Sequence, residues 1–267
     1  MATRALCVGV NKYPNPTLEL KGCVNDAKCW AALLTEHYDF ARSDITMLTD
    51  KRATKARILA GLGDLLSGAK RGDVLVFTNS SHGTYRADTD GDEPLYDEAI
   101  CPYDTKDELI VDDDLRLLFA DIPKGVRLTV ISDSCHSGSA TRDPDALETP
   151  DRRRRRYCDP REIGLPFIDD VRRTARPRTR AAFPESAMNE LLLSGCRADQ
   201  YSYDARFGRR FGGAMSHFAQ QLIADAGYKI TYGQLHRQLV PALRAANYDQ
   251  EPQLEGRTAF KRRQLFT

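Results

Sequence analysis

The chain has 267 residues, of which 41% are hydrophobic and 29% charged, and 39 Lys and Arg residues balance 38 Asp and Glu residues. This length suits one large domain or two small ones, the apolar content excludes a disordered chain, and the near-zero net charge gives no overall attraction to nucleic acid or to an anionic membrane. Seven cysteines without a CxxC pair, and no apolar stretch long enough to span a bilayer, exclude a disulfide scaffold and a membrane protein.

Strands and helices alternate along the chain. In order, the hydrophobic pattern predicts a strand over Arg4–Val10, a helix over Asn25–Tyr38, a strand over Asp44–Leu48, a helix over Lys55–Leu66, a strand over Asp73–Thr78, a helix over Asp113–Ala120, a strand over Arg127–Ser132, a strand over Asn189–Ser194, helices over Ala214–Ala226 and Tyr232–Asn247, and an edge strand over Phe260–Phe266. Continuous apolar strands separated by helices indicate an α/β fold, with a mostly parallel central sheet flanked by helices on both faces.

One segment interrupts this alternation. Asp151–Arg180 contains 11 Arg and 5 acidic residues, carries a charge of +6 and has no sustained helical or strand period. We therefore expect a single domain over residues 1–267, in which a larger part (1–139) and a smaller part (186–267) are joined by an Arg-rich surface loop over 140–185. Because no secretory signal or prodomain precedes the first predicted strand, we expect reduced thiols and a cytoplasmic protein.

Two predicted strands end in reactive side chains. The first is followed by Ser80, Ser81, His82 and Gly83, and the second runs into Asp133, Ser134 and Cys135. The carboxyl ends of parallel strands meet at one edge of a sheet, so Cys135 and His82 can form a nucleophile–base pair. The backbone N–H groups of Gly83 and Cys135 can then stabilise an oxyanion.

These residues carry a family resemblance. The SSHG and DSCHSG segments, together with GVNKY at 9–13, LKGCVNDA at 20–27, DEAICPYD at 97–104, LSGCRADQ at 193–200 and PQLEG at 252–256, resemble the metacaspase and orthocaspase branch of the caspase-like cysteine peptidases. The family commonly has Gly where this chain has Ser81. Asp-specific caspases carry QAC[RQG]G at the nucleophile, which this chain lacks.

The resemblance implies a pocket for the residue before the cleaved bond, lined by Cys23, Asp26, Ser80 and Asp133. Two carboxylates in such a pocket favour Arg, which binds them bidentately, with Lys as a second choice. For Asp26 the alternative is a helix cap. We expect protein or peptide substrates with Arg or Lys before the cut bond, no membrane or nucleic-acid partner, and a monomer.

The resemblance also implies activation by calcium, with no cofactor needed for the chemistry itself. The acidic residues that can supply oxygen ligands are Asp97, Asp112, Asp113 and Asp143. The alternative is that the run beginning at Asp112 simply starts a helix.

The Arg-rich loop allows three interpretations. It can be a solvated linker, a nucleic-acid-binding segment, or the enzyme's own substrate, with self-cleavage after Arg152, Arg153, Arg154, Arg155 or Arg156. We favour the third, because an Arg-selective peptidase with an exposed Arg-rich loop can cut itself. For the whole protein, the alternatives to a peptidase are a catalytically idle caspase-like adaptor and a nucleic-acid-binding protein acting through this loop.

Overall fold

A computed structural model describes residues 1–87, 96–106, 108–135, 153–165 and 185–267. Its helices are α1 (Cys23–His37), α2 (Lys55–Leu66), α3 (Asp112–Ala120), α5 (Ala214–Asp225), α6 (Tyr232–Ala245) and α7 (Thr258–Lys261). Its strands are β1 (Thr3–Gly9), β2 (Ile45–Thr49), β3 (Val74–Ser80), β4 (Gly83–Ala87), β5 (Tyr96–Ile100), β6 (Ile110–Val111), β7 (Arg127–Asp133), β8 (Arg153–Arg155), β9 (Glu190–Ser194), β10 (Tyr203–Phe207), β11 (Arg210–Gly213) and β12 (Gln253–Glu255). Short 3-10 helices lie at Pro16–Leu18, Arg42–Asp44, Asp50–Arg52, Pro160–Ile163 and Glu185–Ala187.

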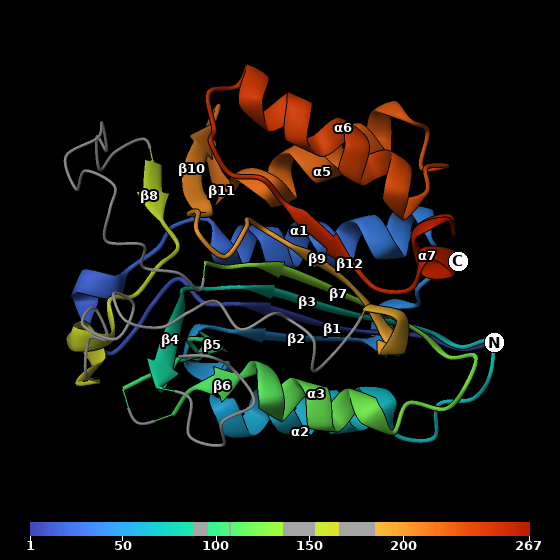
Figure 1. The fold of residues 1–267 in the computed structure, drawn as a ribbon, viewed down its shortest axis with the longest axis horizontal. Coiled ribbons are helices and arrows are strands. Elements are labelled where there is room, and N and C mark those ends of the chain that lie inside the picture. Colours follow the sequence, from blue (N-terminus) through green and yellow to red (C-terminus); the bar gives the residue numbers. More distant parts are fainter. Residues whose placement is uncertain (88–95, 107, 136–152, 166–184) are drawn as a thin grey trace.

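A six-stranded central sheet organises the molecule, with the strand order β12-β9-β7-β3-β1-β2. Every neighbouring pair from β9 to β2 is parallel, and only β12 at the edge runs antiparallel to its neighbour. Helices α1, α5 and α6 cover one face of this sheet and α2 and α3 cover the other (Figure 1). The predicted α/β class, with a mostly parallel sheet between two helical layers, is confirmed.

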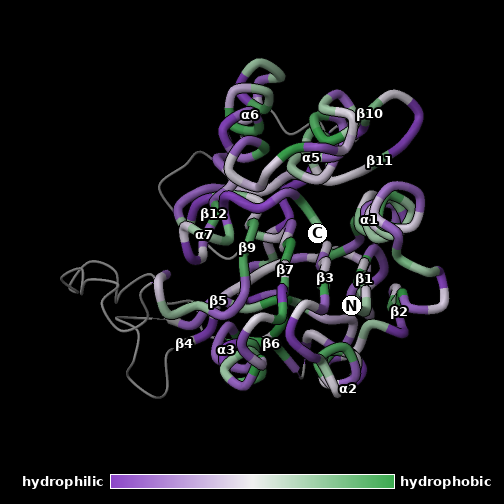
Figure 2. The backbone as a smooth tube through the Cα atoms, turned by 90° about the vertical axis from the view of Figure 1, so that its right-hand side faces the viewer, coloured by the Kyte–Doolittle hydropathy of each residue, from purple (hydrophilic) through white to green (hydrophobic). Residues whose placement is uncertain are grey.

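Two hydrophobic cores follow from the alternation of side chains along the strands. Ala5 and Cys7 of β1 belong to the core under α1, α5 and α6, whereas Leu6 and Val8 belong to the core over α2 and α3. All seven residues of β3 are buried, as expected for a central strand covered on both faces. Figure 2 shows the apolar strands in the middle of the molecule and the more polar helices outside them.

The largest difference from the sequence prediction lies near the C-terminus. Instead of an edge strand over Phe260–Phe266, the chain forms the short helix α7, and the edge strand is β12. The apolar character of the last residues has another cause, since Leu265 and Phe266 are buried in the core beside α1 and α6. The short strands β4, β5, β10 and β11 were not predicted, because none has a long apolar run.

Two small sheets lie at the carboxyl end of the central sheet, on the left in Figure 1. One has the order β4-β5-β6 and the other β11-β10-β8. The second corrects the prediction of a surface loop over 140–185, because residues 153–155 form a strand and Arg156 is fully buried. Residues 140–152 and 166–184 of that predicted loop lie outside the described residues. Within the described part of the chain, no helix has the length and apolarity needed to cross a membrane.

Candidate active site

Cys135 and His82 lie at equivalent positions beyond two adjacent strands. β3 ends at Ser80, two residues before His82, and β7 ends at Asp133, two residues before Cys135. The two strands are parallel, and Ser80 pairs with Asp133 in their register. Both Cys135 and His82 are buried. The parallel register thus brings the two predicted catalytic residues to the same edge of the sheet.

The imidazole of His82 is held in one tautomer. Its Nε2 lies 2.9 Å from the carbonyl oxygen of Leu18, and because a carbonyl can only accept, Nε2 carries the proton. Nδ1 has no hydrogen-bond partner among the residues that the structure describes. Burial, followed by the charge of Arg154, lowers the pKa of His82 to about 3. The ring is therefore neutral near pH 7, with the Nδ1 lone pair available to accept a proton.

Two hydroxyl groups hold the backbone around His82. The N–H of His82 donates to Oη of Tyr13 at 3.0 Å, and Tyr13 donates in turn to the carbonyl of Cys101 at 3.3 Å. Ser81, the residue that differs from the family's usual Gly, is fully buried and donates to the carbonyl of His82 at 2.8 Å. The serine is thus accommodated with its hydroxyl hydrogen-bonded.

The thiol of Cys135 shares an acceptor with a second cysteine. Cys135 Sγ lies 2.9 Å from the carbonyl oxygen of Gln200, and Cys196 Sγ lies 3.4 Å from the same oxygen. All seven cysteines are free thiols. Cys7, by contrast, lies in the core, where burial raises its pKa to about 11 and keeps it protonated.

The two N–H groups expected to stabilise an oxyanion both donate to one carbonyl of the protein's own chain. The carbonyl oxygen of Arg156 accepts from the N–H of Gly83 at 3.0 Å and from the N–H of Cys135 at 3.2 Å. This is the geometry of an oxyanion hole with a peptide carbonyl already in it. The carbonyl carbon of Arg156 consequently lies between the Cys135 and His82 strand ends.

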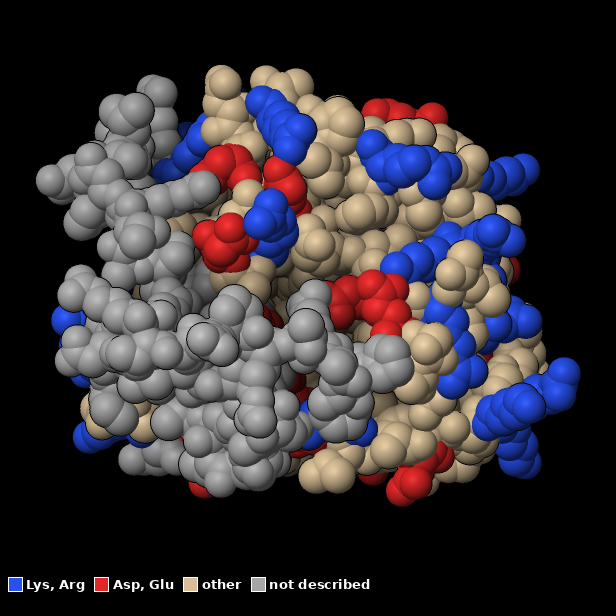
Figure 3. Space-filling view, viewed as in Figure 1, with Lys and Arg blue, Asp and Glu red and all other residues tan. Residues whose placement is uncertain are grey.

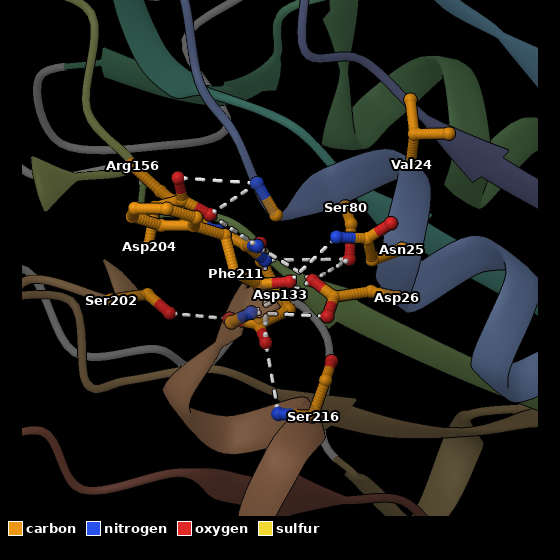
Figure 4. Close-up of polar contacts among 12 residues, drawn as sticks. Val24, Asn25, Asp26, Ser80, Asp133, Arg156, Ser202, Asp204, Phe211 and Ser216 are labelled. Atoms are coloured by element: carbon orange, nitrogen blue, oxygen red, sulfur yellow. Dashed lines mark hydrogen bonds and ion pairs between the residues drawn. The ribbon is translucent and has the colours of Figure 1, made fainter. Parts of the chain in front are cut away.

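The guanidinium of Arg156 fills an acidic pocket (Figure 4). Its Nη2 lies 2.6 Å from Asp26 and 3.1 Å from Asp204, and its Nη1 lies 3.3 Å from both the carboxylate of Asp133 and the hydroxyl of Ser80. Nη1 also donates to the backbone carbonyl of Asp133 at 2.9 Å. Three of the four residues predicted to line an Arg pocket therefore contact this arginine directly.

Backbone N–H groups hold the three carboxylates in place independently of Arg156. Lys21 and Gly22 donate to Asp204, Gly213 donates to Asp26 and Ser216 donates to Asp133, at distances of 2.8–3.0 Å. Ser216 lies in the first turn of α5, so Asp133 also acts as an anion at a helix N-terminus. The pocket is built by the fold itself, and the arginine occupies it.

Burial affects the ionisation of Asp26 in this pocket. Burial raises the pKa of Asp26 to about 7; the charge of Arg156 lowers it and the charge of Asp133 raises it. Cys23, the fourth predicted pocket residue, is a buried thiol at the start of α1, and burial raises its pKa well above its usual value. The alternative for Asp26, a helix cap, is not observed, because Gly22 is the N-cap of α1, Asp26 lies within the helix, and its carboxylate contacts Arg156.

The chain on both sides of Arg156 runs through the site in an extended conformation. β8 pairs antiparallel with β10, and the N–H of Arg156 donates to the carbonyl of Ser202 at 2.8 Å. On the other side, the N–H of Cys158 donates to the carbonyl of Gly83 at 2.9 Å. Residues 153–158 thus lie across the site like a bound peptide.

The predicted self-cleavage candidates differ in their surroundings. Arg152 lies outside the described residues, and the side chains of Arg153, Arg154 and Arg155 lie partly exposed on either side of β8. Among the candidates that the structure describes, only Arg156 has its side chain in the acidic pocket and its carbonyl between the two N–H donors.

The predicted calcium ligands do not converge where the structure describes them. Asp97 pairs with Arg86 at 3.0 Å and Asp113 pairs with Arg116, while Asp143 lies outside the described residues. Among the described residues, no group of three or more His, Cys, Asp or Glu side chains could hold a metal ion. Asp112 and Asp113 begin α3, in agreement with the alternative interpretation.

Sequence reasoning missed Asp204 and the occupant of the pocket. Asp204 lies in β10, 178 positions after Asp26 along the chain, and no motif links the two residues. Its one signal is an acidic residue in a segment with three aromatic residues, YSYDARF at 201–207. Burial of a carboxylate costs free energy of folding unless a cation pairs with it.

A cysteine and a neutral histidine beyond adjacent parallel strands, with two N–H groups directed at one peptide carbonyl, define a caspase-like cysteine peptidase. A family model described as Metacaspase, peptidase C14 domain, matches residues 3–144. The chain is 33% identical to Metacaspase-1 of Scheffersomyces stipitis over 94% of its own length and 70% of that protein. The chain therefore belongs to the metacaspase family of cysteine peptidases.

A second metacaspase and a solved structure are also similar to this chain. Metacaspase-4 of Arabidopsis thaliana is 44% identical over 52% of this chain and 34% of its own length, so the chain spans about a third of that relative. The crystal structure of protein GSU0716 from Geobacter sulfurreducens has a TM-score of 0.73 and 28% sequence identity, and the match covers 100% of this chain and 99% of that one.

Proposed function

We propose that this metacaspase hydrolyses peptide bonds after Arg, and more slowly after Lys, with Cys135 as nucleophile and His82 as general base. One observation carries the proposal. The guanidinium of Arg156 lies among Asp26, Asp133 and Asp204 while its carbonyl accepts hydrogen bonds from Gly83 and Cys135. A peptide with Arg before the cut bond would reproduce both sets of contacts at once.

The chemistry follows from the positions of these groups. His82 Nδ1 accepts the Cys135 thiol proton, and the thiolate attacks the carbonyl carbon of the Arg residue, so that the carbonyl oxygen becomes an oxyanion held by the N–H groups of Gly83 and Cys135. The oxyanion collapses, the C–N bond breaks, and His82 returns the proton to the leaving amine. Water then attacks the thioester, giving a carboxylic acid and the free thiol.

The first substrate is the chain itself, cut between Arg156 and Tyr157. The contacts of Arg156 support this bond over its neighbours, since the other described arginines of the run have neither the acidic pocket nor the N–H pair. Cleavage leaves fragments 1–156 and 157–267. The fragments stay associated, because β9 and β12 of the second share a sheet and a core with β1, β3 and β7 of the first.

Intact-mass analysis of the purified protein tests the proposal. Wild type should yield two fragments that sum to the full chain plus water, that comigrate on a native column, and the second of which begins at Tyr157. Cys135→Ala should stay whole, whereas Cys29→Ala, on the outer part of α1, should cut itself like wild type. A cut at another position would refute the assigned bond. A Cys135→Ala protein that still hydrolyses Arg peptides would refute the nucleophile.

The alternative functions have less support. Family membership disfavours an idle adaptor. A nucleic-acid-binding role would need free arginines, but Arg156 is buried and Arg154 donates to backbone carbonyls of Thr17 and Glu19. On the face drawn in Figure 3, the Lys and Arg side chains of the described residues form separate groups with acidic residues between them. Steeply salt-dependent binding to nucleic acid would favour the alternative.

Calcium activation through Asp97, Asp112, Asp113 and Asp143 is a separate proposal that rests on the acidic sequence pattern. Millimolar Ca²⁺ should then raise activity or thermal stability, and Asp112→Ala combined with Asp113→Ala should remove the effect. Full activity in a chelator, with no calorimetric binding, would refute it. A cytoplasmic location and a monomeric state likewise remain predictions.

A further inference from the structure

The three residues before Arg156 each lie in a distinct set of contacts that suits a cationic side chain. The guanidinium of Arg155 lies 4.4 Å from the ring centroid of Tyr201, and that of Arg153 lies 4.0 Å from the ring centroid of Tyr248. Both distances are well within the range of a cation–π interaction. The first and third residues before Arg156 are thus each placed over an aromatic ring.

Two backbone carbonyls add to the contacts of Arg153. Arg153 also donates to the carbonyls of Asn247 at 2.7 Å and of Ala246 at 3.1 Å, at the end of α6. Carbonyls at a helix C-terminus carry partial negative charge, which favours a cation. The ring of Tyr248 and the end of α6 therefore form a site that a neutral side chain would not satisfy.

The middle residue of the run uses the turn that also holds the catalytic histidine. Arg154 donates to the carbonyl of Glu19 at 2.6 Å and to the carbonyl of Thr17. The carbonyl of Leu18, between them, accepts from His82. Two of these carbonyls thus accept from the guanidinium of Arg154, and the third accepts from the imidazole of His82. The turn at 16–19 therefore contacts both β8 and the general base.

The main chain fixes the spacing of these contacts. β8 adds to the edge of β10 as an antiparallel strand, with Arg155 opposite Tyr203 and Arg153 opposite Ala205. Strand addition gives sequence-independent binding through the backbone and leaves selectivity to the side-chain sites. Any peptide cut at this site would place its own three preceding residues against Tyr201, the 16–19 turn and Tyr248.

We infer that the enzyme selects polybasic substrates, with Tyr201, the carbonyls of Thr17 and Glu19, and Tyr248 with the end of α6 forming binding sites for Arg at the second, third and fourth positions before the cut bond. This inference rests on the proposed cleavage after Arg. The inferred substrate class is a run of four basic residues. The acidic pocket by itself requires only that the last of them be basic.

Fluorogenic tetrapeptides test the inference on the self-cleaved enzyme. Arg-Arg-Arg-Arg should exceed each of the three peptides with a single Ala before the last Arg by about 2- to 30-fold in kcat/KM. Citrulline, which keeps the shape of Arg without its charge, should behave like Ala at the second and fourth positions. Equal rates for all these peptides would overturn the inference while leaving cleavage after Arg intact. Failure to cut any of them would refute the proposed function itself.

Two variants serve as controls for each other. Tyr201→Leu should abolish the preference for Arg over Ala at the second position and keep it at the fourth. Tyr248→Leu should keep the preference at the second position and reduce it at the fourth, where the carbonyls of Ala246 and Asn247 remain. Tyr248→Phe keeps the ring and should retain both preferences. Because each measurement is a ratio within one variant, a general loss of activity or stability does not affect it. Preferences unchanged in both leucine variants would overturn the assignment of these sites.

Discussion

A methyl group on Gly213 would lie 2.1 Å from Oδ2 of Asp133, a distance at which no carbon atom can be accommodated. The same methyl would lie 2.4 Å from Nη1 of Arg156. Gly213 thus forms the wall of the acidic pocket at the point where carboxylate and guanidinium meet. Its N–H also donates to Asp26 at 3.0 Å, so the residue both shapes the pocket and fixes one of its charges.

Gly213→Ala should therefore displace Asp133 and lower kcat/KM for Arg peptides by about 10-fold or more, the effect of about 1.4 kcal/mol. Gly63→Ala is the matched control. Gly63 lies within α2 with nothing within 4 Å of the added methyl, and alanine there should raise the free energy of unfolding by about 0.5–1 kcal/mol without changing activity. Unchanged Arg-peptide kinetics in Gly213→Ala would show that the pocket lies elsewhere.

The two terminal nitrogens of Arg156 contact different acidic groups, which predicts a preference for Arg over Lys. Nη2 contacts Asp26 and Asp204, whereas Nη1 contacts Asp133 and Ser80. A Lys ammonium can reach only one of these positions. Matched peptides should show kcat/KM about 10-fold or more higher for Arg, measured by initial rates under identical conditions.

Asp204→Asn should lower kcat/KM for Arg peptides by about 30-fold or more, because it removes one charge of a buried hydrogen-bonded pair. The loss for Lys peptides should differ, so the Arg-to-Lys ratio should change. Asp225→Asn, at the exposed end of α5, is the control and should leave both rates unchanged. Identical kinetics in Asp204→Asn and wild type would exclude Asp204 from the pocket.

The strands and helices could largely be predicted because their periodicity depends on local burial. The predicted helix over Lys55–Leu66 has the same bounds as α2, and the positions of Cys135 and His82 followed from where parallel strands end. Arg156 could not be placed in this way. A run of five arginines has the composition of a solvated segment, and its burial depends on carboxylates contributed by three distant elements, α1, β7 and β10.

The activity should depend on pH through the pocket rather than through His82. Burial is the largest cause of the raised pKa of Asp26, which lies at about 7 even though the charge of Arg156 lowers it. Below that pKa Asp26 is neutral and attracts a cation less. The kcat/KM for Arg peptides should therefore rise with pH through neutrality and above, since this ratio reports on the free enzyme.

The kcat profile should differ. Burial and the charge of Arg154 hold the pKa of His82 near 3, so its base form persists and kcat should stay flat between about pH 5 and 7. Asp26→Asn should remove the rise of kcat/KM with pH near neutrality, and it should also weaken the binding of Arg peptides. If kcat/KM of Asp26→Asn still rises with pH near neutrality, the titration of a different group causes the rise.

Occupation of the pocket by Arg156 predicts that the uncut chain is blocked. An external peptide must compete with an arginine tethered to the same protein, whose effective concentration is on the order of millimolar. Tyr157→Pro should trap this state, because a proline after the cut bond changes the leaving amine while leaving in place the hydrogen bonds of the segment at Arg156 N, Arg156 O and Cys158 N. Tyr157→Phe is the control and should cut itself and reach wild-type activity.

The Tyr157→Pro protein should stay whole and turn over micromolar Arg peptides at least about 10-fold more slowly. Adding Arg156→Ala to Tyr157→Pro should then empty the pocket and restore activity to a chain that is still intact. Such a restoration would show that occupancy of the pocket, and not the intact bond, blocks the enzyme, because both variants are uncut and only the single variant has Arg156 in the pocket. Full activity in the uncut Tyr157→Pro protein would instead mean that the segment leaves the site freely, and the block would be refuted.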